Sequence, residues 1–118
     1  MKIKKWDIWL ANLDPQIGTE PGKTRPVVVI QTDLLNGIHP STIICPITTN
    51  IELKSDILRV HLKDKEAGLK KQSDILVDQM RAIDNRRLID RLGVLSGQSK
   101  QKLLINISII LDLGSPEK

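Results

Sequence analysis

The sequence predicts a mainly β protein that closes with one C-terminal helix, a small fold of the α+β class. Short runs rich in Val, Ile, Thr and Trp are separated by Gly, Pro, Asn and Asp, as in strands joined by turns. A single amphipathic pattern follows Ser96. Several strands followed by one late helix favour a small antiparallel barrel, or a strongly curved sheet, with the helix packed on it.

The segment Lys23–Ile30 carries the strongest strand signal, because Val27–Ile30 is an uninterrupted run of β-branched residues. Since no polar residue alternates with this run, both faces should be covered, which predicts a central strand. Pro26 has no N–H to donate to a ladder, so we expect it at the first position of the strand. A proline favours an extended conformation at the preceding residue, so Arg25 should project from the mouth of the strand.

Five further strands are predicted from the same signals, at Trp6–Leu13, Thr42–Ile47, Ile57–Leu62, Ser73–Val77 and, more weakly, Leu88–Leu95. Arg59 and His61 share one face of their strand, which should therefore be half exposed. The loop Pro15–Thr24 is longer than two adjacent strands require, and such loops are usually functional or mobile. Further loops are expected at Thr32–Ser41 and Lys63–Gln72.

Ser96 is a good N-cap for the closing helix, which should run to about Leu113 and stop at Gly114, with Pro116 beyond. Its buried face is predicted from apolar residues three and four apart, namely Leu103, Leu104, Ile107, Ile110 and Leu111. Ile105 and Ile109 fall outside this stripe and should remain as apolar surface.

Composition bounds the class of protein. At 118 residues the chain is long enough for one domain, residues 1–118, to fold around its own core. A single cysteine, Cys45, excludes an internal disulfide framework and fits a reducing compartment, so we expect a cytoplasmic protein. Apolar residues nowhere run to membrane-spanning length, so no membrane contact is predicted. The formal charge of +4 suits an acidic partner, but without Phe or Tyr the chain lacks an aromatic platform for stacking bases.

Polar residues that can do chemistry gather at three predicted strand ends. They are Thr19, Glu20, Lys23 and Arg25 before the central strand, Thr48, Thr49 and Asn50 after the third, and Asp78 and Gln79 after the fifth. In a small barrel such ends can converge. An arginine fork suits a phosphate whose charge grows in a transition state, and a threonine hydroxyl both donates and accepts. With a carboxylate as proton acceptor, these groups suffice for RNA strand scission without a metal.

The same residues also have purely structural interpretations. Arg25 could be a surface charge beside a proline, and Glu20 a solvated loop carboxylate. Thr48 and Thr49 could be ordinary hydroxyls at a strand end. Position in the sequence alone does not decide between the two interpretations.

The remaining residues of chemical interest are expected to be structural. His39 and His61 lack a Glu, His or Cys partner at ligand spacing, so no metal site is predicted. Cys45 is expected to be a small buried hydrophobe. Trp6 and Trp9 are expected to be core or dimer contacts rather than base-stacking groups.

Five motifs occur along the chain in a characteristic order. They are Asp7-Ile8-Trp9-Leu10 with Leu13-Asp14-Pro15, Gly18-Thr19-Glu20, the strand Lys23–Ile30, Pro46-Ile47-Thr48-Thr49-Asn50, and Asp78-Gln79 with Arg81-Ala82-Ile83-Asp84. This order, together with the closing helix, resembles the MazF/PemK family, the toxins of type II toxin–antitoxin systems. The resemblance covers nearly the whole chain and is far more specific than any one motif.

The resemblance implies an SH3-like small barrel of the MazF/PemK/CcdB type that forms a homodimer. It also implies an endoribonuclease, an mRNA interferase that cuts single-stranded mRNA at short sequences. The reaction needs neither metal nor other cofactor and leaves a 2′,3′-cyclic phosphate and a 5′-hydroxyl. A cognate MazE-like antitoxin, acidic and partly disordered, would block the site.

Residue roles follow from the same resemblance. The arginine of the Arg-Pro step and the first threonine after the third strand act at the scissile phosphate, which implies Arg25 and Thr48 as catalytic residues. Glu20 is the candidate proton acceptor. The implied RNA contacts are Thr19, Lys23, Thr49, Asn50, Asp78 and Gln79.

The chain departs from one branch of the family. That branch uses an arginine two residues before the Asp-Gln pair and a histidine in the Gly-x-Glu segment, and these positions here are Leu76 and Thr19. The departure favours the version that uses Arg25 and Thr48. RNA sequence preference is the property most expected to differ.

Two other functions fit the same resemblance. Related toxins of this fold bind and poison DNA gyrase through the C-terminal end of the helix, but the tail Gly114–Lys118 offers no distinctive contact residues. A catalytically inactive relative would bind RNA or antitoxin with Arg25 and Thr48 in place and cut nothing.

Overall fold

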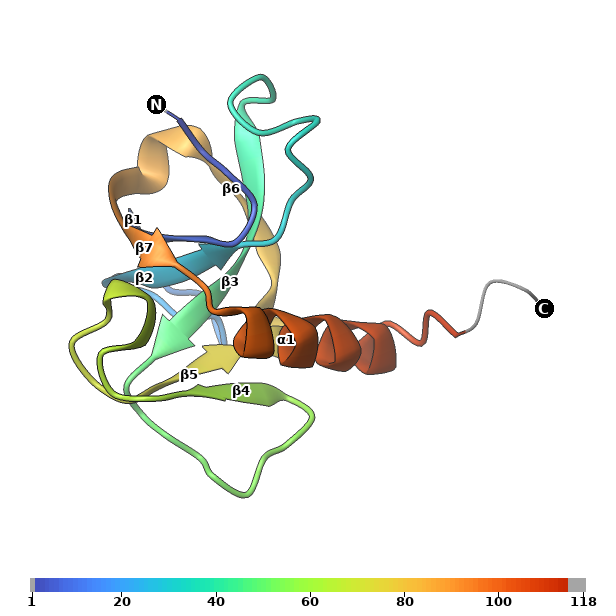
Figure 1. The fold of residues 1–118 in the computed structure, drawn as a ribbon. Helices are drawn as coiled ribbons and strands as arrows, with labels where there is room; N and C mark the ends of the chain where they lie inside the picture. Colours follow the sequence, from blue (N-terminus) through green and yellow to red (C-terminus); the bar gives the residue numbers. More distant parts are fainter. Residues whose placement is uncertain (1, 115–118) are drawn as a thin grey trace.

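The computed structural model describes residues 2–114, and within them one α-helix follows a set of short strands (Figure 1). The strands are β1 (Asp7–Asn12), β2 (Thr24–Val29), β3 (Ser41–Thr48), β4 (Arg59–Leu62), β5 (Ser73–Leu76), β6 (Arg81–Asp84) and β7 (Leu88–Val94). The helices are α1 (Gly97–Ile110) and three 3₁₀ turns, η1 (Glu66–Gly68), η2 (Val77–Gln79) and η3 (Asn85–Arg87). Pro116 and most of the tail Gly114–Lys118 lie outside the described residues. Over residues 2–114, no helix has the length and apolar character needed to cross a membrane.

The strands form one antiparallel sheet in the order β4-β5-β3-β2-β1-β7, and β6 pairs with β3 beside this path. The predicted fold class, mainly β with a C-terminal helix, is therefore confirmed. The sheet curves around the core without closing, because β4 and β7 remain its two edges (Figure 1). Five of the six predicted strands closely match observed ones, and only β4 is clearly shorter than predicted, since Ile57 and Leu58 precede it in an exposed loop.

The central position of β2 is confirmed, because Val27, Val28 and Val29 are all 0% exposed. The prediction for Pro26 is wrong, since β2 begins at Thr24 and the proline is its third residue. Pairing with β1 starts at Thr24, whereas pairing with β3 starts only at Val27. The edge of β2 that faces β3 is thus unpaired at Pro26, and a missing N–H costs no ladder hydrogen bond there.

Two apolar clusters pack on the two faces of this sheet. The cluster beneath α1 contains Val28, Cys45 and Leu103, and the cluster on the other face contains Val27 and Trp9. Burial raises the pKa of the Cys45 thiol to about 12, with the negative charge of Asp78 adding to the effect. Cys45 is therefore a neutral core residue, as predicted.

Trp9 belongs to the core and not to an exposed contact surface. Trp9 was predicted to be either a core residue or a dimer contact. It is 6% exposed, which confirms the core assignment and leaves little of its surface for a dimer contact. Its indole Nε1–H donates to Asp7 at 3.3 Å, which satisfies the polar end of the buried ring.

Strand β6 was missed, because Arg81–Asp84 holds only two apolar residues. It continues β5 along the same edge of β3, but η2 interrupts the ladder. Ile75 pairs with Ile47, whereas Arg81 pairs with Ile44, so six steps along β5–η2–β6 match three along β3. The extra residues form η2 and lift its backbone off the edge of β3, which carries Asp78 and Gln79 outward.

Helix α1 begins as predicted, since the Ser96 hydroxyl accepts the N–H of Ser99. It ends earlier than predicted, at Ile110. Leu113 N–H bonds to Ser108 O and Asp112 N–H to Ile109 O, the two bonds of a Schellman motif. Asp112, with φ +53°, takes the left-handed position of this motif, so the helix stops before Gly114, where it was expected to stop.

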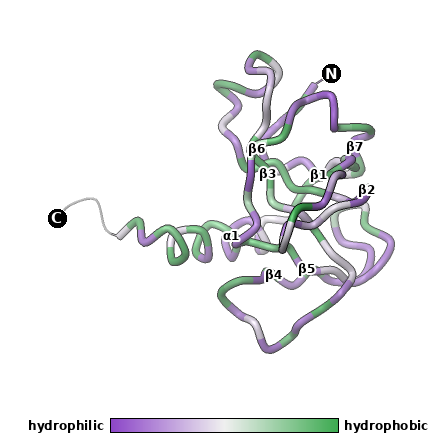
Figure 2. Tube along the Cα trace, turned by 180° about the vertical axis from the view of Figure 1, so that it is seen from behind, coloured by the Kyte–Doolittle hydropathy of each residue, from purple (hydrophilic) through white to green (hydrophobic). Residues whose placement is uncertain are grey.

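The buried stripe of α1 differs from the predicted one. Leu103 is buried, but Leu104 and Leu111 are exposed, and the polar Ser99 and Asn106 are buried in their place. The reason is that the second half of α1 projects beyond the strands, where hydrophobic segments of the helix remain uncovered (Figures 1 and 2). The resulting apolar surface comprises Leu104, Ile105, Ile109, Leu111 and Leu113.

Candidate functional site

Arg25 and Thr48 lie just beyond the same end of the β2–β3 ladder. The last pair between β2 and β3 is Val27 with Pro46, and Arg25 and Thr48 are each two residues past it on their own strands. Residues two apart on a strand share one face of the sheet, so Arg25 lies on the face of Val27 and Thr48 on the face of Pro46. Both residues are half-buried, and Thr48 also pairs with Asp74 of β5. The register therefore joins two distant motifs of the sequence at one end of the sheet.

Backbone and side-chain hydrogen bonds join the two ends of the loop that precedes β2. Lys23 N–H donates to Asp14 Oδ1 at 2.6 Å, and Leu13 N–H donates to Lys23 O at 2.8 Å. Arg25 Nε donates to Gly22 O at 2.9 Å, which holds the guanidinium against the loop. The predicted site residues Thr19 and Glu20 therefore lie in a loop whose two ends are held together.

A hollow of about 290 Å³ lies between this loop, the segment 52–59 and η2. Its lining residues are Thr19, Pro21, Glu52, Ser55, Leu58, Arg59, Leu76, Asp78 and Gln79. Three predicted RNA contacts, Thr19, Asp78 and Gln79, are thus brought together from separate motifs. The remaining predicted residues do not line this hollow; they are Glu20, Lys23, Arg25, Thr48, Thr49 and Asn50. Of these, Lys23, Thr49 and Asn50 are exposed, whereas Glu20 is half-buried.

A buried carboxylate that the sequence did not single out lies beside Thr48. Asp74 is 0% exposed, and both its oxygens are engaged. His61 Nδ1 lies 2.7 Å from Oδ1, while Arg59 Nη1 and Glu52 N–H donate to Oδ2 at 3.0 and 2.9 Å. Because a carboxylate only accepts, we assign a proton to Nδ1 of His61. The buried charge is therefore paired and fully hydrogen-bonded.

The segment Thr48–Glu52 is held against this carboxylate. Arg59 Nη1 bridges two acceptors, since it also donates to Asn50 O at 2.7 Å. Asn50 N–H donates to Thr48 Oγ1 at 3.1 Å, and Glu52 N–H ends on Asp74. The backbone that carries Thr48, Thr49 and Asn50 is thereby fixed at both of its ends.

Sequence reasoning placed Arg59 and Asp74 in strands and gave them no role. One signal was available, because Asp74 is a charged residue inside the apolar run Ser73–Val77. His61 and Asp74 are direct partners in the β4–β5 ladder. That register depends on pairing across the connection Lys63–Gln72, which no local pattern specifies.

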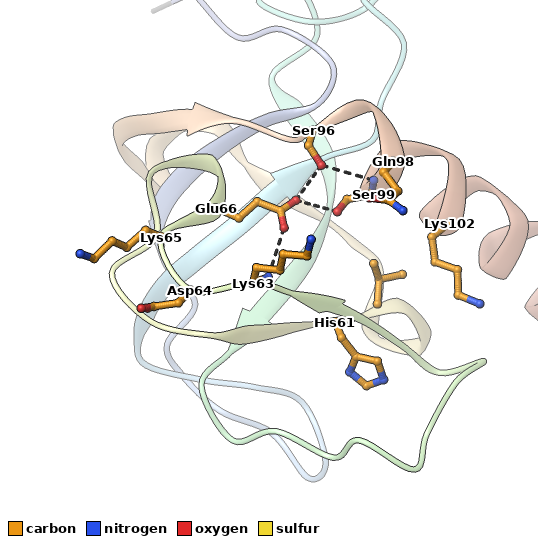
Figure 3. A pocket seen from close by; sticks show the side chains of 10 residues that line it. His61, Lys63, Asp64, Lys65, Glu66, Ser96, Gln98, Ser99 and Lys102 are labelled. Atoms are coloured by element: carbon orange, nitrogen blue, oxygen red, sulfur yellow. Dashed lines mark hydrogen bonds between the residues drawn. The ribbon is translucent and has the colours of Figure 1, made fainter.

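A second hollow, of about 690 Å³, lies between β4, η1 and the start of α1 (Figure 3). None of the predicted site residues lines it. Glu66 is one of its lining residues and accepts hydrogen bonds from Ser99 Oγ at 2.6 Å, Ser96 Oγ at 2.8 Å and Lys63 N–H at 3.1 Å. Burial alone would raise the pKa of Glu66, but these hydrogen bonds outweigh it and lower the pKa. The carboxylate joins η1 to the first turn of α1.

Metal-ligating side chains do not cluster within residues 2–114, where no three His, Cys, Asp or Glu residues are grouped for an ion. The predicted catalytic residues are Arg25, Thr48 and the carboxylate of Glu20. An arginine and a hydroxyl can stabilise a phosphate as its negative charge grows. The arrangement suits transfer at a phosphodiester.

The fold is a curved antiparallel sheet with one C-terminal helix, and polar residues from separate motifs of the sequence gather at one end of it. A family model described as PemK-like, MazF-like toxin of type II toxin-antitoxin system matches residues 4–111. The chain therefore belongs to the MazF/PemK family of endoribonuclease toxins.

Individual relatives agree with this membership. The chain is 35% identical over 113 residues to Endoribonuclease EndoA of Bacillus subtilis (strain 168), covering 96% of this chain and 97% of the relative. MazF from Deinococcus radiodurans has a TM-score of 0.81 at 23% identity, covering 95% of this chain and 98% of that one. A mycobacterial endoribonuclease in complex with its cognate antitoxin has a TM-score of 0.78 at 14% identity, covering 97% and 99%. The last two similarities concern the fold alone.

Proposed function

We propose that this chain cuts single-stranded mRNA at short recurring sequences, without a metal, and that its whole length forms one toxin domain. The observation that supports the proposal is the register of β2 and β3, whose last pair, Val27 with Pro46, lies two residues from both Arg25 and Thr48. The 2′-hydroxyl of the RNA attacks the adjacent phosphorus, so a P–O2′ bond forms and the P–O5′ bond breaks. The products are a 2′,3′-cyclic phosphate and a 5′-hydroxyl.

Arg25, Thr48 and Glu20 have separate roles in this reaction. Arg25 stabilises the phosphate as it becomes more negative, because a guanidinium donates in a planar fork and stays charged. Thr48 donates its hydroxyl to a second phosphate oxygen. Glu20, half-buried in the loop, accepts the proton from the 2′-hydroxyl, and the departing 5′ oxygen takes a proton from solvent.

The RNA is recognised by polar groups around the hollow. Thr19, Asp78 and Gln79 line it, and Lys23, Thr49 and Asn50 lie exposed on the neighbouring loop and segment. The lysine contributes charge attraction to the phosphates, and the amide and hydroxyl groups read base edges. The lack of Phe and Tyr means that this recognition depends on hydrogen bonds more than on stacking.

Two protein partners belong to the proposal. The solved relative bound to its cognate antitoxin supports an acidic, MazE-like antitoxin that lies along the RNA groove and blocks it. A second copy of the chain forms a homodimer, for which the exposed apolar surface of α1 around Ile105 and Ile109 is available. The working compartment is the cytoplasm, where mRNA is found and a lone cysteine stays reduced.

The test is cleavage of a long single-stranded RNA by purified protein in excess EDTA, with cut sites and end chemistry mapped. Arg25→Ala should lose roughly two to three orders of magnitude in rate, because losing one donor to a developing oxyanion costs about 2.7 to 4 kcal/mol. The matched control is Arg86→Ala, since Arg86 is an exposed arginine paired with Asp84 away from the site.

Cuts at one short sequence, with cyclic phosphate ends and loss of activity only in Arg25→Ala, would support the proposal. A folded Arg25→Ala protein of near-normal activity would contradict the assignment. Cleavage that stops in EDTA and returns with added divalent metal would contradict the metal-free reaction. If the folded protein, free of antitoxin, cuts nothing, the gyrase poison and the inactive relative become the leading alternatives, and gyrase supercoiling separates them.

A further inference from the structure

We propose that Asp74 is a positioning residue for RNA cleavage, acting through Arg59 on the segment Thr48–Glu52. This inference rests on the proposed ribonuclease function of the same site. Asp74 itself is fully buried and does not touch RNA. It fixes the conformation in which Thr48, Thr49 and Asn50 meet the phosphate and the bases.

The C-terminal end of the segment Thr48–Glu52 is bound to Asp74. Glu52 N–H donates to Asp74 Oδ2 at 2.9 Å, so the chain turns back onto the buried carboxylate after the exposed residues Thr49 and Asn50. Hydrogen bonds to a buried charged group are stronger than average and costly to lose. This one bond therefore restricts where the segment can move.

Arg59 links Asp74 to the backbone of Asn50. A single nitrogen, Nη1, donates both to Asp74 Oδ2 at 3.0 Å and to Asn50 O at 2.7 Å. The side chain is 22% exposed; its bond to Asp74 is partly buried, while its bond to Asn50 lies at the surface. Asn106 of α1 fixes the backbone beneath, donating to Arg59 O at 3.2 Å and to Asp56 O at 3.0 Å. The carboxylate thus orients the Asn50 carbonyl through a side chain that is itself supported.

The hydroxyl of Thr48 is hydrogen-bonded to the same segment. Its Oγ1 accepts the N–H of Asn50 at 3.1 Å, which uses one lone pair and leaves the hydroxyl hydrogen to be donated elsewhere. The orientation of the hydroxyl therefore depends on the Thr49–Asn50 peptide. Arg59 holds the next peptide, Asn50–Ile51, through the Asn50 carbonyl, and so restricts the backbone of Asn50. Disturbing Asp74 should misplace the hydroxyl that meets the phosphate, and small misplacements can cost about a hundredfold in rate.

The experiment compares Asp74→Asn with Asp7→Asn in RNA cleavage, measuring kcat per folded molecule, KM and cut-site preference. Asparagine keeps the shape of the side chain but removes the charge and replaces one acceptor with a donor. Asp7 is the matched control, because it is buried, accepts hydrogen bonds from a backbone N–H and a ring N–H, and forms an ion pair with Arg91 of β7, at the far end of β1 from the site. We expect Asp74→Asn to lower kcat about a hundredfold, raise KM and weaken cut-site preference. Asp7→Asn should leave all three unchanged below its unfolding temperature.

A merely structural role would change the folded fraction without changing kcat per folded molecule, KM or cut sites. Unchanged values in folded Asp74→Asn would overturn the inference while leaving the ribonuclease intact. Failure of the wild-type chain to cut RNA would overturn the proposed function and, with it, this inference.

If Asp74→Asn does not fold, Arg59→Met serves in its place, because Arg59 reaches the surface. Its kcat should fall and its KM rise, and Arg59→Lys should recover part of the loss by keeping a cation against Asp74. Normal kcat and KM in Arg59→Met would overturn the inference.

Discussion

Asp7 and Asp74 are two buried carboxylates with the same kinds of partners in two different regions of the sheet. Each has a backbone N–H, a ring nitrogen and an arginine as partners. For Asp7 the partners are Lys4 N and Trp9 Nε1, which donate hydrogen bonds at 3.0 and 3.3 Å, and Arg91 Nε, which forms an ion pair at 3.1 Å. For Asp74 they are Glu52 N, His61 Nδ1 and Arg59 Nη1, at 2.9, 2.7 and 3.0 Å.

The difference lies in what the donors are attached to. The partners of Asp7 belong to the N-terminal segment, β1 and β7, so this carboxylate ties the start of the chain to an edge of the sheet. The partners of Asp74 lead into the segment Thr48–Glu52, which carries predicted site residues. Carboxylates with the same kinds of partners can therefore stabilise a fold in one region and shape a site in another, depending on the segments to which those partners belong.

The largest effect is expected from removing either carboxylate. Asp7→Ala and Asp74→Ala should each lower the free energy of unfolding by about 3 kcal/mol, because the donors left behind lose a buried charged partner. Urea unfolding monitored by circular dichroism measures this loss. The comparison becomes sharper if RNA cleavage, measured well below the unfolding midpoint, survives in Asp7→Ala but not in Asp74→Ala. Similar cleavage rates in the two variants would contradict the claim that Asp74, unlike Asp7, shapes the site.

A smaller effect is expected from removing the arginines. Arg91 is 50% exposed and Arg59 22% exposed, so water and salt screen the first ion pair more than the second. Arg91→Met should lower the free energy of unfolding by less than about 1 kcal/mol, and the loss should shrink in high salt. Arg59→Met should cost about 1.5 to 2 kcal/mol with a weaker salt dependence. Unfolding curves at low and high salt test this order, and equal losses for the two variants would contradict it.

The smallest effect concerns a third carboxylate, Glu66, which is only half-buried. Hydrogen bonds from Ser99 and Ser96 hold its pKa below the usual value despite burial. Because the folded pKa lies below the unfolded one, its contribution is fully present above the unfolded value of about 4.5 and is lost as the pH falls through the folded pKa. Glu66→Gln should therefore destabilise the protein near neutral pH and flatten the loss of stability on acidification. Unfolding midpoints from pH 7 down through the acid range measure the slope, and an unchanged slope would contradict this assignment.

Local patterns in the sequence determined most of the secondary structure. The β-branched run Val27–Ile30 fixed a strand covered on both faces, and Ser96 fixed the start of α1. These features depend on neighbours one to four residues away, which the sequence shows directly. The motif order around Arg25 and Thr48 likewise indicated the family before any pairing was known.

Tertiary structure decided what depends on register and on packing partners. The sequence did not reveal that η2 breaks the ladder along β3, or that α1 leaves Leu104 and Leu111 uncovered. It also did not reveal that Asp74 of β5 pairs with His61 of the neighbouring β4 and accepts the N–H of Glu52. Such contacts join residues far apart in the chain, and no local preference encodes which of many registers buries the most apolar surface while satisfying each buried charge.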